Sequence, residues 1–448
     1  MQRGLLGLSA GLGAVLVVGA TLAPRAQAPA QADAEFLRTA YDTYRSMVTS
    51  SPHKANWSYL GPTNVSGRST DVAVADKNGQ RRIYVAYATS GIWKTDDNGT
   101  SWQVIWEHMP STSIGDIAVA PSNPDIVYVG TGEANIFRAS MAGVGMYKST
   151  DAGRTWQHIG LTDTQTIGRV IVHPTNPDIV WVAATGHEWT DNEMRGIFKT
   201  TDGGKNWTKV YYKSPRTGAN DLAIDPRNPD VLYASMWQRI RRKWSDPRVE
   251  PGYSEGGVVK SSDGGKTWTD ASQGLPAPQF RGRIGIDISR SNPDTLYALV
   301  DNYEIGREAK PGERDAYGRT MPAGSGFIKG ADVYRSDDGG KTWRQTSRKT
   351  PESTNWLMNR QSGTYGWVFG QIRVDPTNVN RVWILGVPLS MSTDGGETFA
   401  EMPGTDDVHG DHHGMWIDPA NPNIIYNSND GGFYMTADGG KTWNFAVS

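Results

Sequence analysis

The stretch Ser149-Thr150-Asp151-Ala152-Gly153-Arg154-Thr155-Trp156 decides the fold, because its pattern occurs seven times along the chain. The pattern is Ser/Thr-x-Asp-x-Gly-x-Thr/Ser/Asn-Trp/Phe. The hydroxyl and the carboxylate can bond backbone N–H groups within a tight turn, and the glycine permits a positive φ. Such a turn between apolar runs predicts a hairpin. The seven aspartates are Asp97, Asp151, Asp202, Asp263, Asp338, Asp394 and Asp438.

A second turn precedes most copies of this pattern. Pro121-Ser-Asn-Pro-Asp125 has counterparts that begin at Pro174, Pro226 and Pro419, each between β-rich runs. Each repeat therefore predicts strand A, a proline turn, strand B, a variable loop, strand C, the Asp-containing turn and strand D.

Four antiparallel strands repeated seven times predict an all-β, seven-bladed β-propeller of four-stranded antiparallel blades, with the Asp-box turns between strands C and D. An open solenoid is the alternative, but a closed ring avoids the exposed edges that a solenoid must cap. Either Trp57–Gly61 or the terminal segment Trp443 to Ser448 closes the ring beside the seventh blade, and closure by the N-terminal strand is favoured.

The N-terminus predicts export. Residues 1–32 have a basic start, an apolar run and Ala-x-Ala sites, which are typical of a signal peptide. A retained membrane anchor is the alternative, because the apolar run approaches the length that spans a bilayer. We expect a secreted or periplasmic protein with no stable membrane insertion after cleavage. Residues 33–55 predict a helix and linker, and residues 56–448 the propeller.

Composition excludes several kinds of site. The chain has no cysteine among its 448 residues, which excludes disulfides and thiolate metal sites, and its net charge of −2 argues against a nucleic-acid partner.

These motifs match the Asp-box, or bacterial neuraminidase repeat, family. Trp57-x-x-x-Gly-Pro62, the Asp151 repeat and His409-Gly-Asp-His-His413 followed by Asn429-Asp-Gly-Gly432 are narrower. They resemble the N-terminal propeller of bacterial secreted sortilin-type and glycosyl-hydrolase-like proteins, similar to xyloglucanases of glycoside hydrolase family 74. Such proteins generally continue into a second propeller, so the resemblance implies a short or truncated form.

The resemblance also bears on activity. It places Ala88 where xyloglucanases of that family carry one catalytic aspartate, and the Arg-Ile-Pro motif of sialidases does not occur. It therefore implies that neither activity proceeds by its known mechanism. Photosystem II assembly factors, which are also propellers of this general kind, keep a protein-binding scaffold as a further interpretation.

Loop lengths indicate the working face. The long insertions lie between strands B and C, on the face opposite the Asp boxes, and insertions gathered on one face mark a binding face. Exposed aromatic side chains there could stack on sugars or anchor a protein partner. We expect ligand contacts from Trp189, Trp237 and Trp367, whereas packing beneath the long loops is the alternative.

One strand-A position in each blade is expected to line the central channel. These residues could hold a polar ligand, or could form salt bridges with each other. The expected lining residues are Asp71, Asp116, Arg169, Asp221, Arg283 and Gln371, with Gly414 in the last blade.

The segment from Asp406 to His413 carries the densest set of metal-ligand residue types. In an extended segment His409, Asp411 and His413 project to one side, a set that suits a divalent metal such as zinc or calcium. A hydrogen-bonded loop at the channel mouth is the alternative.

Catalysis would need converging carboxylates. Glu133, Glu188 and Asp430 each begin a B–C loop in a different blade, so they are the candidate catalytic set. The sequence favours an exported, non-catalytic propeller that binds a glycan, peptide or protein on its loop face. A xyloglucanase-like glycoside hydrolase acting on extracellular polysaccharide is the alternative.

Overall fold

The structure is a computed structural model that describes residues 34–52, 67–77, 79–135, 140–239, 255–314, 318, 320–321, 326–347, 366 and 368–447. The predicted N-terminal helix is α1, Ala34–Ser50. The predicted signal peptide and Trp57–Gly61 lie outside the described residues. Within the described ranges, none of the helices has the length and apolar character needed to cross a membrane.

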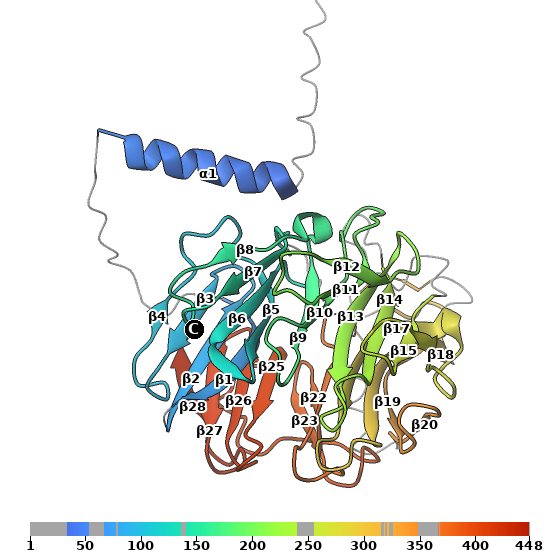
Figure 1. The fold of residues 1–448 in the computed structure, drawn as a ribbon. Coiled ribbons are helices and arrows are strands. Elements are labelled where there is room, and N and C mark those ends of the chain that lie inside the picture. The colour runs from blue at the N-terminus through green and yellow to red at the C-terminus, as the bar shows by residue number, and fades with distance from the viewer. Residues whose placement is uncertain are drawn as a thin grey trace, which may run out of the picture. The chain divides into compact units, whose positions relative to one another are not determined.

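Seven four-stranded antiparallel sheets follow one another along the chain, as predicted (Figure 1). The first four are β1 Ser69–Lys77, β2 Gln80–Tyr87, β3 Ile92–Thr95, β4 Gln103–Val104; β5 Ile114–Ala120, β6 Asn123–Thr131, β7 Met146–Ser149, β8 Gln157–His158; β9 Ile167–Val172, β10 Val180–Ala184, β11 Gly196–Thr200, β12 Thr208–Tyr211; and β13 Thr217–Ile224, β14 Leu232–Gln238, β15 Gly257–Ser261, β16 Thr269–Asp270.

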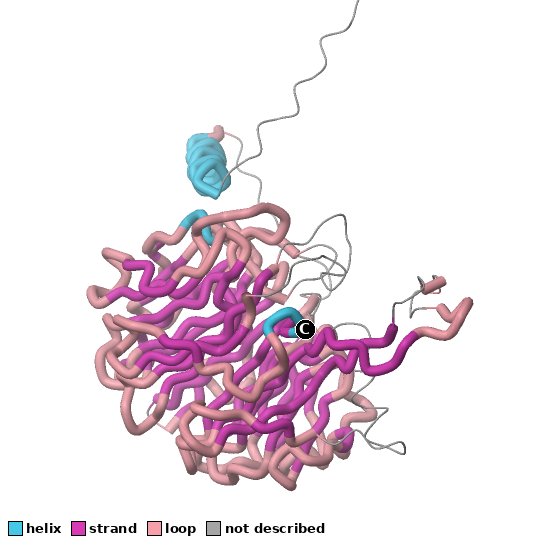
Figure 2. Tube along the Cα trace, turned by 90° about the vertical axis from the view of Figure 1, so that its right-hand side faces the viewer, coloured by secondary structure: helices cyan, strands magenta, loops and turns pink. Residues whose placement is uncertain are grey.

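The last three sheets are β17 Arg281–Ile288, β18 Leu296–Glu308, β19 Gly326–Ser336, β20 Arg344–Gln345; β21 Gln371–Val374, β22 Val382–Leu385, β23 Leu389–Ser392, β24 Ala400–Glu401; and β25 His412–Ile417, β26 Ile425–Asn429, β27 Gly432–Thr436, β28 Asn444–Val447. Two 3₁₀ turns, η1 Thr162–Thr164 and η3 Pro278–Phe280, lie between sheets. Strands and loops make up almost all of the propeller (Figure 2). We number the sheets as blades one to seven.

The first strands of neighbouring blades contact each other around the whole ring, including β25 against β1. Blade seven takes its fourth strand from β28 at the C-terminus, the second of the two predicted candidates. The seam between blades seven and one is made by side chains. Arg81 pairs with Asp418 at 2.7 Å and lies over the Trp416 ring, and Trp102 packs edge-on against Phe433.

All seven predicted Asp-box turns have the same hydrogen bonds. In the second box, the Ser149 hydroxyl donates to Asp151 at 2.8 Å, and the other carboxylate oxygen accepts from the Thr155 hydroxyl at 2.7 Å. The Thr155 N–H also donates to Asp151 at 2.9 Å, and the corresponding bonds occur in the other six boxes. Burial opposes the ionised form of Asp151, but the hydrogen bonds from Thr155 lower its pKa to about 2. Each box is therefore an ionised, fully bonded turn.

The aromatic residue that ends a box also joins blades. The indole N–H of Trp156 donates to the Ile105 carbonyl of the preceding blade at 3.0 Å, and that of Trp207 donates to Ile159. In the opposite direction, the Tyr128 hydroxyl donates to Pro177 of the next blade at 2.8 Å. Because apolar side chains of adjacent sheets form the core clusters, most of the core lies between blades.

The long loops all connect strand B to strand C, or strand D to the next strand A, which places them at the face opposite the boxes. In blades two, three and four they join β6 to β7, β10 to β11 and β14 to β15. In blade five the predicted insertion is instead a long hairpin of β18 and β19.

Candidate functional site

Five ionisable side chains gather where the long-loop face meets the central channel. We call this group the channel mouth: Arg68, Glu133, Glu188, His413 and Asp430. They come from four blades, and each lies in a loop or at a strand end on the long-loop face. The charges of Asp430 and Glu188 both act on the pKa of Glu133.

Glu133 follows β6 and is only 1% exposed. One of its carboxylate oxygens, Oε2, accepts a hydrogen bond from Arg68 at 2.5 Å. The other, Oε1, is buried with no hydrogen-bond partner among the described residues. Burial raises the pKa of Glu133; Arg68 opposes the shift, and the negative charges of Asp430 and Glu188 add to it. Glu133 is therefore an acid that holds its proton more strongly than an exposed glutamate.

Asp430 lies in the tight turn between β26 and β27. Its Oδ1 is 2.7 Å from His413 Nε2. Burial disfavours the ionised form, but the hydrogen bond and charge of His413, together with the charge of Arg68, outweigh it and lower the pKa of Asp430. Glu133 and Asp430 therefore have pKa values shifted in opposite directions although their charges interact.

Glu188 begins the loop between β10 and β11 and is buried. Its charge reaches Glu133, so all three predicted carboxylates lie around one site. Arg68 relates Glu133 to Asp430, because the charges of both carboxylates raise the pKa of its guanidinium group.

The predicted channel residues form salt bridges with each other. Arg169 lies 2.9 Å from Asp116, 3.0 Å from Asp221 and 3.9 Å from Asp71. The same carboxylates also accept backbone N–H groups of the next blade, as Asp116 does from Val170 at 2.7 Å. Burial raises the pKa of Asp116 and Arg169 lowers it. The polar atoms of these four side chains form salt bridges and hydrogen bonds that join neighbouring blades.

Arg283 and Gln371 do not share one position in the ring. Strand pairing places Gly285, not Arg283, level with Asp221. Asp221 lies two residues before the residue that pairs with Tyr233, and Gly285 lies two residues before the residue that pairs with Tyr297. Arg283 therefore lies one step closer to the channel mouth. Gln371 keeps the predicted level and accepts a hydrogen bond from Arg373 at 2.5 Å.

The structure does not bring His409, Asp411 and His413 together as a metal-binding group. The described residues contain no group of three His, Cys, Asp or Glu side chains that could hold a metal ion. The segment is not regularly extended: Asp411 has a φ of 64°, and the strand register shifts between His412 and Gly414. His413 is buried against Asp430 and Phe369, and His409 bonds the Gly410 carbonyl.

The three predicted tryptophans have different environments. Trp189 is 42% exposed on the loop after β10, as a ligand-stacking side chain requires. Trp237 is 1% exposed and packs against Val368 and Phe369, so it cannot offer a surface for stacking. Trp367 lies outside the described residues.

Sequence reasoning missed Arg68, Asn135 and Arg239. Arg239 is 1% exposed and donates to the carbonyls of Ala134 and Gly186. The position of Arg68 one residue before β1 could have revealed it, since that position lies beside the D–A loops. No local signal marks Asn135.

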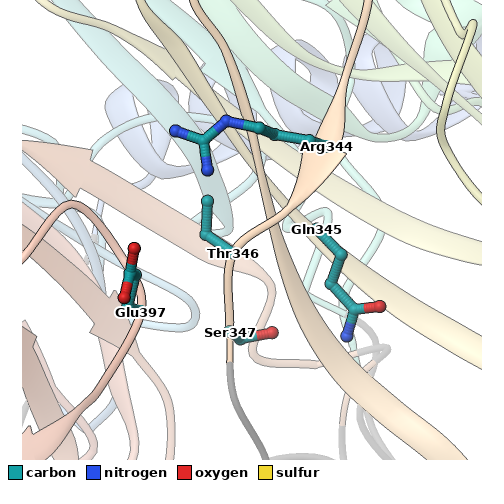
Figure 3. A pocket seen from close by; sticks show the side chains of 5 residues that line it. All are labelled: Arg344, Gln345, Thr346, Ser347 and Glu397. Carbon is teal, nitrogen blue, oxygen red and sulfur yellow. The ribbon is translucent and has the colours of Figure 1, made fainter.

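A cleft of about 350 Å³ lies away from the channel mouth (Figure 3). It is formed by the end of β20 and the sixth Asp box, and its lining residues are Arg344, Gln345, Thr346, Ser347 and Glu397. None of the predicted site residues lines it, so we place the candidate site at the channel mouth.

Comparison with known proteins agrees with this architecture. The family profile described as "Sortilin, neurotensin receptor 3" matches residues 144–310, and the BNR/Asp-box repeat profile matches residues 334–345. The chain is an Asp-box β-propeller. A xyloglucanase from Paenibacillus sp is 22% identical over 380 residues, which cover 72% of this chain and 33% of that protein.

Two solved structures share the fold. The GH74 enzyme of Niastella koreensis has 18% identity and a TM-score of 0.55, and the match covers 86% of this chain and 55% of that one. YCF48 from Cyanidioschyzon merolae has 13% identity and a TM-score of 0.50, over 85% and 99% of the two chains. The chain spans about a third of the length of the Paenibacillus relative. The Paenibacillus relative is named a xyloglucanase and the Niastella structure a GH74 enzyme, names that agree with the glycoside-hydrolase alternative rather than with the non-catalytic binder that the sequence favoured.

Proposed function

We propose that this Asp-box propeller is a glycoside hydrolase that cleaves an extracellular polysaccharide at the channel mouth, with Glu133 as the general acid and Asp430 as the second carboxylate. The observation that carries the proposal is the pairing of these two groups. Arg68 bonds Glu133 and its charge also acts on Asp430, while the negative charge of Asp430 adds to the raised pKa of Glu133. Carboxyl pairs whose environments separate their pKa values are typical of acid and base roles.

The chemistry follows from the two protonation states. Protonated Glu133 gives its proton to the glycosidic oxygen as the bond from that oxygen to the anomeric carbon breaks. In the inverting course, water attacks the anomeric carbon and gives a proton to ionised Asp430. In the retaining course, Asp430 attacks first and water later releases the sugar. The anomeric configuration of the first product distinguishes the two courses.

Glu133 and Asp430 differ from the aspartates that the resemblance implied. Ala88, at the position of the family's first-blade aspartate, is buried in the short loop after β2. A xyloglucanase-like activity here would therefore use a different acid. Trp189 and the exposed part of the long-loop face would supply contacts to the glycan chain.

The test is turnover of a polysaccharide panel that includes xyloglucan, by purified protein and by three variants. Glu133→Gln and Asp430→Asn should each lower kcat/KM by about 10²-fold or more. Glu401→Gln, an exposed carboxylate on β24, is the matched control and should keep full activity. Turnover that survives both substitutions would refute these roles. Glycan binding without turnover by the unmodified protein would instead support the non-catalytic interpretation.

A further inference from the structure

The loop that carries Glu133 is held from across the channel. Its next two residues, Ala134 and Asn135, are both buried. Asn135 Oδ1 accepts a hydrogen bond from Arg283 Nη2 at 2.7 Å, and the Ala134 carbonyl accepts one from Arg239 Nη1 at 3.3 Å.

The two arginines come from distant blades. Glu133 follows β6 in blade two, whereas Arg283 lies on β17 in blade five, and Arg239 follows β14 in blade four. Blades two and five are separated by at least two other blades in either direction around the ring. The bond from Arg283 to Asn135 therefore crosses the channel.

Trp237 fixes both arginines. The Arg239 guanidinium carbon lies 5.3 Å from the centre of the Trp237 ring, and that of Arg283 lies 5.9 Å from it. Arg283 also donates to the Val368 carbonyl, and a side chain at Gly370 would lie 2.8 Å from Arg283 Cδ. Such buried guanidinium groups with several bonds are costly to move.

Arg283 bonds the Asn135 side chain of this loop, and Arg239 bonds the Ala134 backbone. The carboxylate of Glu133 is bonded instead by Arg68. Arg239 and Arg283 thus bond the residues next to Glu133, and the charge of Arg283 also interacts with that of Glu133.

We propose that Arg283, through Asn135, and Arg239 are positioning residues that hold Glu133 buried at the channel mouth. This inference rests on the proposed function. It also predicts that the channel floor is closed by these side chains, so that a glycan approaches Glu133 from the long-loop face.

The loop's own amide groups provide a readout that is independent of activity. Gly132 N–H donates to the Ser113 carbonyl at 2.8 Å, and Glu133 N–H donates to the Ser113 hydroxyl at 3.1 Å. Their hydrogen exchange measures opening of the loop.

The experiment compares Asn135→Ala, Asn135→Asp and Asn192→Ala by hydrogen exchange and by the pH profile of kcat/KM. Asn135→Ala removes the acceptor for Arg283, so exchange at residues 132–135 should rise about tenfold or more. Activity should fall by about 10²-fold. The alkaline limb of the profile should move to lower pH, because a mobile Glu133 becomes hydrated and ionises more readily. Asn135→Asp restores an acceptor and should restore slow exchange.

Asn192→Ala is the matched control, because Asn192 is a buried loop asparagine that bonds Asp163 in blade three. It should leave exchange at residues 132–135 and the alkaline limb unchanged. Unchanged exchange in Asn135→Ala would overturn the positioning role, as would faster exchange with an unmoved alkaline limb. If the unmodified protein has no glycan turnover, faster exchange in Asn135→Ala still supports the clamp, and the proposed function alone fails.

Discussion

Arg169 is the side chain whose loss should damage the ring most, because it faces three buried carboxylates. Arg169→Leu leaves Asp71, Asp116 and Asp221 without their shared cation. Removing one partner of a buried charge group costs about 3–5 kcal/mol. An unfolding entropy of about 2.1 cal/mol/K per residue, over a propeller of about 380 residues, gives about 0.8 kcal/mol/K. The melting temperature should therefore fall by about 4–6 °C.

The pH dependence gives this prediction its sign. Burial already raises the pKa of Asp116 above its ordinary value, and Arg169 is the largest opposing influence. A carboxyl whose folded pKa is raised stabilises the fold at low pH and loses that contribution as pH rises through the folded pKa. Without Arg169 this pKa rises further, so the loss of stability should be larger at pH 8 than at pH 5.

Calorimetry of both proteins at the two pH values measures this difference. Arg154→Leu is the control, because Arg154 is exposed on an Asp-box turn and its replacement should change stability by less than about 0.5 kcal/mol. A deficit for Arg169→Leu no larger than that of Arg154→Leu, or equal deficits at pH 5 and pH 8, would refute the role of Arg169 as the shared cation.

Two further outcomes follow from single positions. Asp151→Ala should lower the free energy of unfolding by about 1 kcal/mol at pH 7, after allowance for solvent screening. Because the pKa of Asp151 is lowered to about 2, this cost should disappear as pH falls from about 4 to 2. Urea titrations at several pH values measure the cost, and a pH-independent cost would contradict the prediction. Gly132→Ala should lower both the melting temperature and any glycan turnover. Gly132 has a φ of +86°, and a Cβ there would lie 1.8 Å from the Gln165 carbonyl oxygen. Wild-type melting and turnover would show that the loop tolerates the side chain.

The repeat carried most of the fold prediction. Each Asp box contains its own hydrogen-bonding partners within eight residues, so local sequence is enough to specify the turn. The blade count and strand order follow from that turn. The ring closure did not follow, because Trp57–Gly61 and the C-terminal strand have similar local patterns and only sheet pairing distinguishes them.

The site was harder to predict, because its contacts cross the ring. Glu133, Glu188 and Asp430 were found because a propeller brings the starts of its B–C loops together. Arg283 was assigned to the wrong level, since a shift of two residues along a strand keeps a side chain on the same face. The histidine segment failed for a related reason: one left-handed residue, Asp411, ends the alternation that the metal prediction assumed.

The seam between blades seven and one has a mechanical consequence. Every other pair of neighbouring blades is tied by the polypeptide itself, whereas in the described part of the chain this pair is held by the packing of β1 on β25 and β26 and by contacts such as Arg81 with Asp418 and Trp102 with Phe433. A force that pulls the two ends of the propeller apart should therefore separate blade seven from blade one first. Asp430 lies in blade seven, and Arg68 lies directly before β1 of blade one. Opening of this seam would therefore separate Asp430 from Arg68 before any blade loses a strand.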